Sequence, residues 1–166
     1  MSFKVIVVLH NVHSVLRVMD MARLVYGIPL AEMFIISKAS GAAAQTGIPE
    51  VHKLAYRLGK PLLCVPDLED AVSLMNPSEI LLVDPSGERE LDRILNNIVH
   101  KLSESNETVM IVFSGSDTYF TKQEKALGKI VYFNNLDRPL GCIAEAAIFL
   151  HELLKKLKKV HADHPN

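Results

Sequence analysis

Three polar loops contain the residues that could do chemistry in this chain. Residues 11–17, 114–117 and 131–142 each follow a short apolar run and bring amide, hydroxyl, imidazole or guanidinium groups next to small residues. In open α/β sheets, ligands bind at loops that follow the carboxyl ends of strands. The three loops are therefore the candidate functional site.

The first loop carries two groups suited to catalysis. The guanidinium of Arg17 stays charged at all working pH values, and Asn11 brings an amide to the same loop. The imidazole of His13 titrates near neutrality and could alternatively serve as a base. The same residues also fit a plainer interpretation, in which Asn11 and Ser14 cap a helix and Arg17 is a solvated charge.

The other two loops combine small residues with close backbone packing. Gly115 lies between two serines, an arrangement that lets a ligand approach the backbone, although a tight turn explains it equally well. Gly141 precedes an alanine-rich helical segment and indicates tight packing over the turn before it. An ordinary C-terminal helix docked on the sheet is the alternative.

Composition limits the kinds of protein that the chain can be. Its 166 residues are 49% hydrophobic and 22% charged, which predicts one globular domain spanning residues 1–166. The 18 Lys and Arg residues nearly balance the 19 Asp and Glu residues, so a nucleic-acid contact needs a local basic surface. The four lysines between residues 155 and 159 could provide one, or could stabilise the C-terminus of a helix.

The cysteines and the apolar runs indicate a compartment. Cys64 and Cys142 lie far apart without CxxC spacing, which argues against a zinc site and a disulfide framework. No apolar run has the length of a signal core or of a membrane span. We therefore expect a soluble protein in a reducing cytoplasm, with no metal and no membrane partner.

Short apolar runs alternate with segments of helical period and must position these loops. The segments between the runs place apolar residues on one helical face, and the runs are continuous, as in strands buried on both faces. This pattern predicts an α/β fold with a six-stranded parallel sheet covered by helices on both faces. Asp67, Ser86 and Thr121 are candidate helix caps, and residues 39–47 are expected to form a mobile loop. The apolar runs are residues 5–9, 33–37, 62–65, 80–83, 109–113 and 130–133.

The three loops, in this order, resemble the three motifs of the SPOUT superfamily of RNA methyltransferases, SpoU type. Residues 11–17 match the first motif, an Asn followed by small and aliphatic residues and an Arg. Residues 111–117 match the second, an apolar strand leading to Gly-Ser and an acid. Residues 131–152 match the third, whose helix is rich in Ala and ends in an aromatic residue and Glu.

The resemblance implies both a fold and an activity. SPOUT proteins have a C-terminal trefoil knot and form homodimers, and they transfer a methyl group from S-adenosylmethionine to RNA. For this chain the resemblance implies ribose 2'-O methylation of rRNA or tRNA, with Arg17 and Asn11 as catalytic residues. The implied cofactor-binding residues are Ser114, Gly115, Val131, Tyr132, Phe133, Leu140, Gly141 and Cys142.

Several positions depart from the family pattern and leave alternatives open. His13 replaces a Gly, Asp117 replaces a Glu, and Pro139 and Gly141 stand where ribose-methylating relatives have a catalytic Ser and Asn. A catalytically inactive RNA- or cofactor-binding protein is thus the main alternative. A restriction-like nuclease ranks lower, because an Asp follows Pro66 but residues 80–83 lack the Glu-x-Lys expected on the next strand. A general nucleotide-binding α/β domain is a further alternative, although the chain has neither a GxGxxG motif nor a Walker loop.

Overall fold

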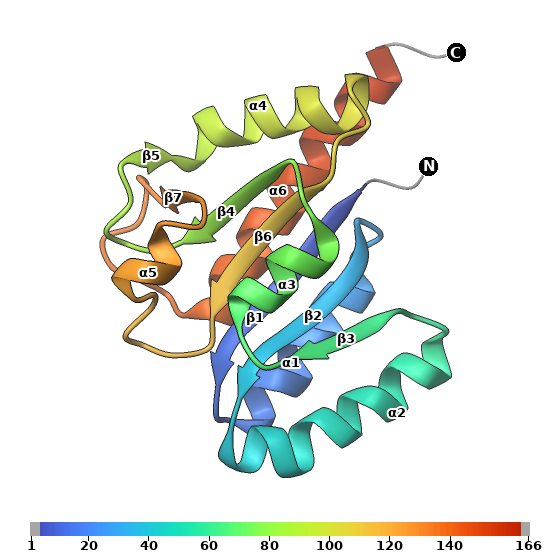
Figure 1. The fold of residues 1–166 in the computed structure, drawn as a ribbon. Coiled ribbons are helices and arrows are strands. Elements are labelled where there is room, and N and C mark those ends of the chain that lie inside the picture. The colour runs from blue at the N-terminus through green and yellow to red at the C-terminus, as the bar shows by residue number, and fades with distance from the viewer. Residues whose placement is uncertain (1–3, 164–166) are drawn as a thin grey trace.

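A parallel sheet forms the centre of the molecule (Figure 1). The computed structural model describes residues 4–163, within which the sheet has seven strands in the order β3-β2-β1-β6-β4-β7-β5. All six expected strands are present, but the predicted number of strands is too low by one. The additional strand is β5, whose two residues are too few to leave an apolar pattern. The strands are β1 (Val5–Val12), β2 (Ala31–Ala39), β3 (Leu62–Val65), β4 (Glu79–Val83), β5 (Arg89–Glu90), β6 (Val109–Ser114) and β7 (Lys129–Tyr132).

Helices connect the strands and cover both faces of the sheet, as the alternating pattern predicts. The long C-terminal helix packs against the helices that precede β2 and β6, on the same face. Among the helices of residues 4–163, none combines the length and apolar character that crossing a bilayer requires. The helices are α1 (Val15–Gly27), α2 (Ile48–Leu58), α3 (Leu68–Met75), α4 (Leu91–Glu104), α5 (Lys122–Lys125) and α6 (Cys142–Asp163).

Two hydrophobic cores lie on opposite faces of the sheet. In β1, Val5, Val7 and Leu9 belong to the core under α1, α2, α4 and α6, whereas Ile6 and Val8 belong to the core under α3 and the segment around α5. Successive side chains of a strand point to opposite faces, so a strand buried on both faces needs the continuous apolar run that the sequence shows.

Side-chain caps fix where the short helices begin. Asp67 caps α3 and Thr121 caps α5, and each forms a reciprocal capping box with the acid three residues later. The third expected cap is wrong: Ser86 donates its hydroxyl proton to Asp84 in a turn at 2.6 Å, and α4 begins after Glu90. The two capping boxes fix the starts of α3 and α5 at one edge of the sheet.

The segment expected to be a mobile loop is mostly helical. Ala43–Gly47 forms a π-helical turn that continues directly into α2. Its backbone is anchored to the loop after β1, since the amide of Ala43 donates to the carbonyl of His13 at 3.0 Å. The turn lies against α1, since an added Cβ on Gly47 would make ordinary van der Waals contact, 3.4 Å from the Cβ of Val18.

Glu79 is a buried carboxylate whose contribution to stability depends on pH. It accepts hydrogen bonds from Lys101 and Lys129. Burial alone would raise its pKa, but the two lysines outweigh burial and hold the pKa below its usual range. A carboxyl whose pKa is lower in the folded state adds stability above its unfolded pKa, and this stability is lost as the pH falls through the folded pKa.

We expect the Glu79→Gln substitution to lower the free energy of unfolding by about 2 kcal/mol at pH 7, because it removes the partner of two lysines. The difference from the wild type should shrink as the pH falls below about 4. Urea unfolding at pH 7 and pH 3.5 measures both values. An equal loss at the two pH values would contradict the ionic origin.

Candidate functional site

The carboxyl ends of the parallel strands meet at one edge of the sheet, and the backbone there is unusual. Five non-glycine residues among 4–163 have positive φ, and Asn11 (58°), Lys38 (52°) and Tyr119 (57°) lie at this edge. The other two, Asn76 and Asn106, follow helices, where asparagine often adopts this conformation. Such strain persists where surrounding contacts enforce it and marks candidate functional sites.

A buried histidine lies at the centre of this edge. His10 is fully buried near the end of β1, beside its register partner Ser37 on β2. Its Nδ1 lies 2.8 Å from Oγ of Ser37, and its Nε2 lies 2.8 Å from Oε1 of Glu124. A carboxylate can only accept, so Nε2 carries a proton, and the hydroxyl of Ser37 is the hydrogen-bond partner of Nδ1. The imidazole is thus fixed at both nitrogens.

Glu124 reaches the histidine from α5, 114 residues away in the chain. Its Oε2 accepts the backbone amide proton of Thr121 at 2.8 Å in the capping box, which leaves Oε1 free to face His10. Burial alone would raise the pKa of Glu124, but hydrogen bonds from Thr121 and His10 and the charge of Lys38 hold it below its usual range. Glu124 is therefore an ionised, buried carboxylate at neutral pH.

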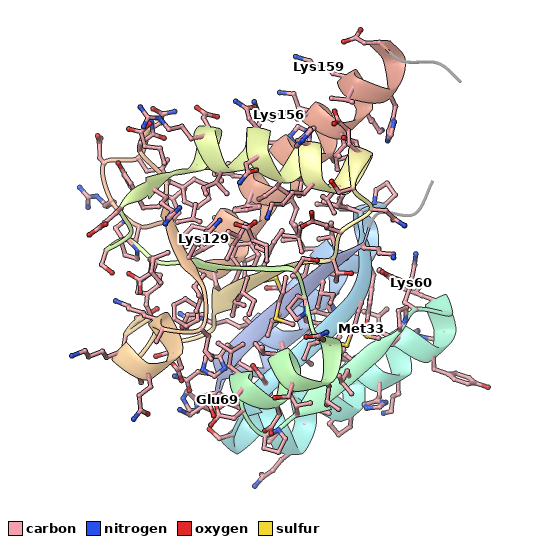
Figure 2. The ribbon with its side chains drawn as sticks, turned by 45° about the horizontal axis from the view of Figure 1, so that its top comes forward. Met33, Lys60, Glu69, Lys129, Lys156 and Lys159 are labelled. Carbon is pink, nitrogen blue, oxygen red and sulfur yellow. The ribbon has the colours of Figure 1, made fainter. Side chains whose placement is uncertain are left out.

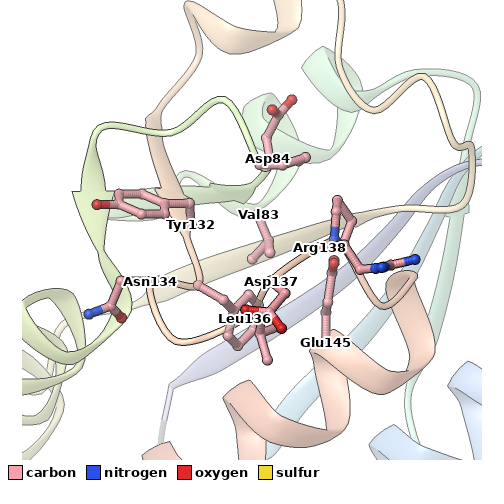
Figure 3. Close-up of a pocket in the computed structure, with 11 residues that line it drawn as sticks. Val83, Asp84, Tyr132, Asn134, Leu136, Asp137, Arg138 and Glu145 are labelled. Atoms are coloured by element: carbon pink, nitrogen blue, oxygen red, sulfur yellow. The ribbon is translucent and has the colours of Figure 1, made fainter.

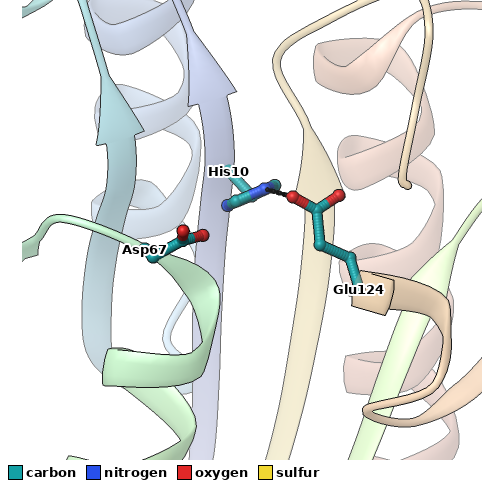
Figure 4. Close-up of side chains that lie close together, drawn as sticks. All are labelled: His10, Asp67 and Glu124. Atoms are coloured by element: carbon teal, nitrogen blue, oxygen red, sulfur yellow. Dashed lines mark hydrogen bonds and ion pairs between the residues drawn. The ribbon is translucent and has the colours of Figure 1, made fainter. Parts of the chain in front are cut away.

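Two further charged groups complete the cluster. The carboxylate of Asp67, exposed at the start of α3, His10 and Glu124 each offer one ligand atom, and these three atoms lie within 4.8 Å of one another. Figure 4 shows the two carboxylates flanking the imidazole. The ammonium of Lys38 lies 3.6 Å from Oε1 of Glu124. We call His10, Lys38, Asp67 and Glu124 the edge cluster.

The structure brings the first two predicted loops together. Nη1 of Arg17 donates to the carbonyl of Gly115 at 2.5 Å, and Nη2 donates to Asp117 at 3.2 Å. The hydroxyl of Ser14 accepts the amide proton of Arg17 and caps α1, as the plainer interpretation predicts. Arg17 thus ties one loop to the other, and the catalytic roles predicted for Arg17 and Asn11 stay predictions.

Gly115 is the position where this loop contact allows no side chain. A Cβ added there would lie 2.7 Å from the Cβ of Val12 and 3.0 Å from the carbonyl oxygen of Asn11. We expect Gly115→Ala to lower the free energy of unfolding by about 2 kcal/mol, since such overpacking forces the backbone to move. Gly27→Ala, where nothing lies within 4 Å, is the matched control in urea unfolding. Equal effects of the two substitutions would contradict the close contact.

A second feature, a pocket of about 290 Å³, opens beside the ends of β4 and β7 (Figure 3). Val83, Tyr132 and Phe133 give it apolar and aromatic walls, and the carboxylates of Asp84 and Glu145 line it as well. A site with apolar walls and a few fixed polar groups is typical of small-molecule binding.

The pocket contains part of the predicted cofactor site. Of the eight residues predicted to bind cofactor, Tyr132 and Phe133 line the pocket. Val131 is buried in β7, Gly141 has φ of 89°, and Leu140 is exposed. The other three predicted residues lie at the ends of elements. Ser114 ends β6 and Gly115 follows it, and Cys142 begins α6. Their predicted cofactor contacts stay predictions.

The pocket carboxylates differ in their electrostatics. Burial raises the pKa of Glu145, which accepts the amide proton of Leu140 at 3.1 Å. Burial acts on Asp84 in the same direction, but hydrogen bonds from Ser86 and the nearby Lys125 outweigh it and lower the pKa. Nζ of Lys125 lies 3.3 Å from Oδ2 of Asp84. Because Glu124 and Lys125 are neighbours, α5 contacts both the edge cluster and the pocket.

Sequence reasoning missed most of the edge cluster. It noted Asp67 after Pro66 but sought the second acid on residues 80–83, whereas the structure supplies it from Glu124 on α5. His10 lies within an apolar run and Lys38 at the end of another, so neither stood out. The available signal was that each cluster residue lies at or just after a predicted strand or at a helix start.

Sequence comparison identifies the family. A family model described as RecB-family nuclease (DUF2122) matches residues 41–152. A candidate type II restriction enzyme from Aeropyrum pernix is 42% identical over 155 residues, covering 93% of this chain and 96% of that protein. Another from Methanocaldococcus jannaschii is 34% identical over 158 residues, covering 93% of this chain and 99% of that protein.

Comparison of structures points to a different kind of protein with the same fold. A probable methyltransferase from Bordetella pertussis superposes with a TM-score of 0.77 at 13% identity, covering 93% of this chain and 95% of that one. The SpoU methyltransferase AviRb from Streptomyces viridochromogenes, solved with AdoMet, gives 0.71 at 10% identity, covering 96% and 63%. The resemblance to SPOUT proteins therefore holds at the level of the fold.

The sequence comparisons contradict the predicted function. Likeness at 10–13% identity shows a shared fold, whereas the matching family model and both sequence relatives carry nuclease or restriction-enzyme descriptions. The prediction of an S-adenosylmethionine-dependent RNA methyltransferase is therefore wrong, as is the low rank given to a nuclease. With a family model matched over residues 41–152 and two relatives matched over almost their whole length, the chain belongs to the RecB-family nuclease (DUF2122) family.

Proposed function

We propose that this protein hydrolyses phosphodiester bonds of DNA at the edge cluster. The observation that carries the proposal is the convergence of His10, Lys38, Asp67 and Glu124 from four separate segments at one edge of the sheet. The descriptions of its family and relatives supply the class of substrate. No other group of acidic and imidazole ligands of this kind is present among residues 4–163.

The chemistry of the cluster suits this reaction. Hydrolysis places a water molecule in line with the leaving oxygen and builds negative charge on the phosphate. The carboxylates of Asp67 and Glu124 can accept hydrogen bonds from the attacking water and so position it. The ammonium of Lys38, on a side chain about half exposed, can contact a phosphate oxygen and stabilise its charge.

Cleavage of supercoiled plasmid DNA tests the proposal. The wild type is expected to convert it to nicked or linear forms, and Glu124→Gln is expected to lower the rate at least about 100-fold. Gln retains the capping box, so the variant should fold. Glu69→Gln is the matched control, because this exposed acid lies on the same edge in the first turn of α3 (Figure 2). Equal cleavage by all three proteins would contradict the proposal.

We further propose that the 290 Å³ pocket binds S-adenosylmethionine as a ligand, without methyl transfer. The aromatic wall of Tyr132 and Phe133 suits a purine, and the carboxylates of Asp84 and Glu145 suit hydroxyl donors and a sulfonium. The fold shared with an AdoMet-bound SpoU structure supports the same ligand. Calorimetry with S-adenosylmethionine tests this, and no heat of binding at millimolar ligand would contradict it.

The remaining implications of the SPOUT resemblance stay proposals. These are the trefoil knot, the homodimer and the RNA partner. The single domain, expected from composition, and the cytoplasmic location, expected from the cysteines, stay proposals as well. The exposed apolar side chains of Leu16 and Ile148, on the contacting helices α1 and α6, support a homodimer. Light scattering coupled to size-exclusion chromatography gives the mass that distinguishes a dimer from a monomer.

Lys156 and Lys159 mark the basic end of α6 in Figure 2, the surface that could contact RNA, although Lys156 already donates to Asn96 of α4 at 3.1 Å.

A further inference from the structure

One short segment between β6 and β7 supplies part of the edge cluster. Residues 119–125, which we call the bridging segment, include α5. The ring of Phe120 stacks on the imidazole of His10 with centroids 6.0 Å apart. Oε1 of Glu124 lies 2.8 Å from Nε2 of the same imidazole. Any movement of the bridging segment therefore changes two of the groups that surround His10.

The same segment is also held by two carboxylates of the 290 Å³ pocket. Tyr119, at its first position, donates its hydroxyl proton to Oε1 of Glu145 at 3.5 Å. Lys125, at its last position, places Nζ 3.3 Å from Oδ2 of Asp84. Both carboxylates line the pocket. A ligand in the pocket would therefore meet the groups that fix the bridging segment.

Asp84 has one oxygen that a ligand could use. The residue is buried, and its Oδ1 accepts from the amide and the hydroxyl of Ser86 at 2.8 and 2.6 Å. Its Oδ2 is also buried and accepts no hydrogen bond from any residue among 4–163. The ammonium of Lys125 donates to the hydroxyl of Ser86 at 2.9 Å and faces Oδ2 only through its charge. Because buried polar atoms are usually hydrogen-bonded, Oδ2 favours a donor from the pocket.

The pocket is suited to a small organic cation with an apolar part. Its charged residues give it a net negative charge, and its aromatic rings can contact a positive group by their faces. A positive ligand at Oδ2 of Asp84 would repel the ammonium of Lys125, which faces the same oxygen. The charged lining residues are Asp84, Asp137, Glu145 and Arg138, and the aromatic ones are Tyr132 and Phe133.

We propose that a cationic ligand in this pocket inhibits the edge cluster, by competing with Lys125 for Asp84. The four-residue helix α5 has little stability of its own, so its position depends on its contacts at both ends. When the ligand weakens the contact of Lys125, the neighbouring Glu124 is held less firmly against His10. The inference rests on the proposed nuclease function for its effect on DNA cleavage, but the competition at Asp84 can be measured without it.

Calorimetry with S-adenosylmethionine, whose sulfonium carries the positive charge, measures the competition. Lys125→Met removes the competing ammonium and should raise the affinity about fivefold or more, a typical size for coupling between sites. Lys122→Met removes the same charge from the exposed side of α5 and is the matched control, which should bind as the wild type does. Equal affinity of the wild type and Lys125→Met, or no binding at millimolar ligand, would overturn the inference.

Plasmid cleavage and the imidazole NMR signals of His10 measure the effect on the edge cluster. S-adenosylmethionine should slow cleavage by the wild type about fivefold or more and shift these signals. S-adenosylhomocysteine lacks the positive charge and should do neither. A shift of the His10 signals in a chain that cleaves no DNA would support the inference and overturn the nuclease proposal. Cleavage and His10 signals that stay unchanged with S-adenosylmethionine bound would overturn the inference and leave the nuclease proposal standing.

Discussion

Replacing Lys38 with Met is expected to lower DNA cleavage about 100-fold or more while leaving the free energy of unfolding nearly unchanged. The ammonium of Lys38 lies 3.6 Å from Oε1 of Glu124 and is positioned by a backbone with φ of 52°. A preorganised positive group that contacts charge developing in the transition state contributes about this much to catalysis. Met keeps the length and apolar stem of Lys, so the substitution removes the charge with little change in packing.

A second substitution at this position separates catalysis from folding. Lys38→Gly should lose the same activity but unfold with a free energy up to about 1 kcal/mol higher, because Gly adopts positive φ without strain. Lys122→Met, on the exposed side of α5 near the same edge, is the charge-matched control. Plasmid cleavage and urea unfolding give both quantities. Wild-type cleavage by Lys38→Met would exclude the ammonium from the reaction.

The largest expected effect on stability comes from His10. We expect His10→Leu to lower the free energy of unfolding by about 3 kcal/mol, because the buried carboxylate of Glu124 and the hydroxyl of Ser37 both lose a partner. The imidazole also stacks on Phe120 with ring centroids 6.0 Å apart, a contact that Leu only partly replaces. Urea unfolding of the wild type and the variant measures the loss.

Two further variants show whether the loss comes from unpaired polar groups. Ser37→Ala removes one hydrogen bond and should cost only about 1 kcal/mol. Combining His10→Leu with Glu124→Gln removes the unpaired charge and should recover part of the stability lost in His10→Leu alone. A double variant less stable than the single one by the full cost of Glu124→Gln would show that the two residues are not coupled.

The role of α5 illustrates how one short element can serve two sites. Its Glu124 contacts His10, and its neighbour Lys125 donates to Ser86 at 2.9 Å and pairs with Asp84 beside the pocket. The hydroxyl of Thr121 and the carboxylate of Glu124 close the capping box that fixes the helix start. A four-residue helix has little stability of its own. Its position therefore depends on these contacts at both ends.

The motif resemblance was informative about the fold and misleading about the activity. Residues 11–17 and 114–117 meet, joined by Arg17 and Gly115. These contacts serve to pack two loops where parallel strands end. Loop sequences shaped by such packing can persist in proteins with different chemistry, because the fold constrains them whatever the site does. Family membership came instead from similarity along most of the chain.

The sequence by itself determined the elements of this protein. Continuous apolar runs predict strands buried on both faces. Asp67 and Thr121 mark helix starts that the structure confirms, because capping depends on a few neighbouring residues. Ser86 failed as a cap because its hydroxyl bonds to Asp84 instead. Strand β5 was not predicted, because two residues leave no periodic signal.

Only the tertiary structure decided which residues share a site. The strand order β3-β2-β1-β6-β4-β7-β5 results from crossovers between distant segments, and no local pattern encodes it. That order places β1 beside β2 and brings the loops after β3 and before β7 to the same edge. His10, Lys38, Asp67 and Glu124 meet for this reason, although 114 residues separate the first from the last.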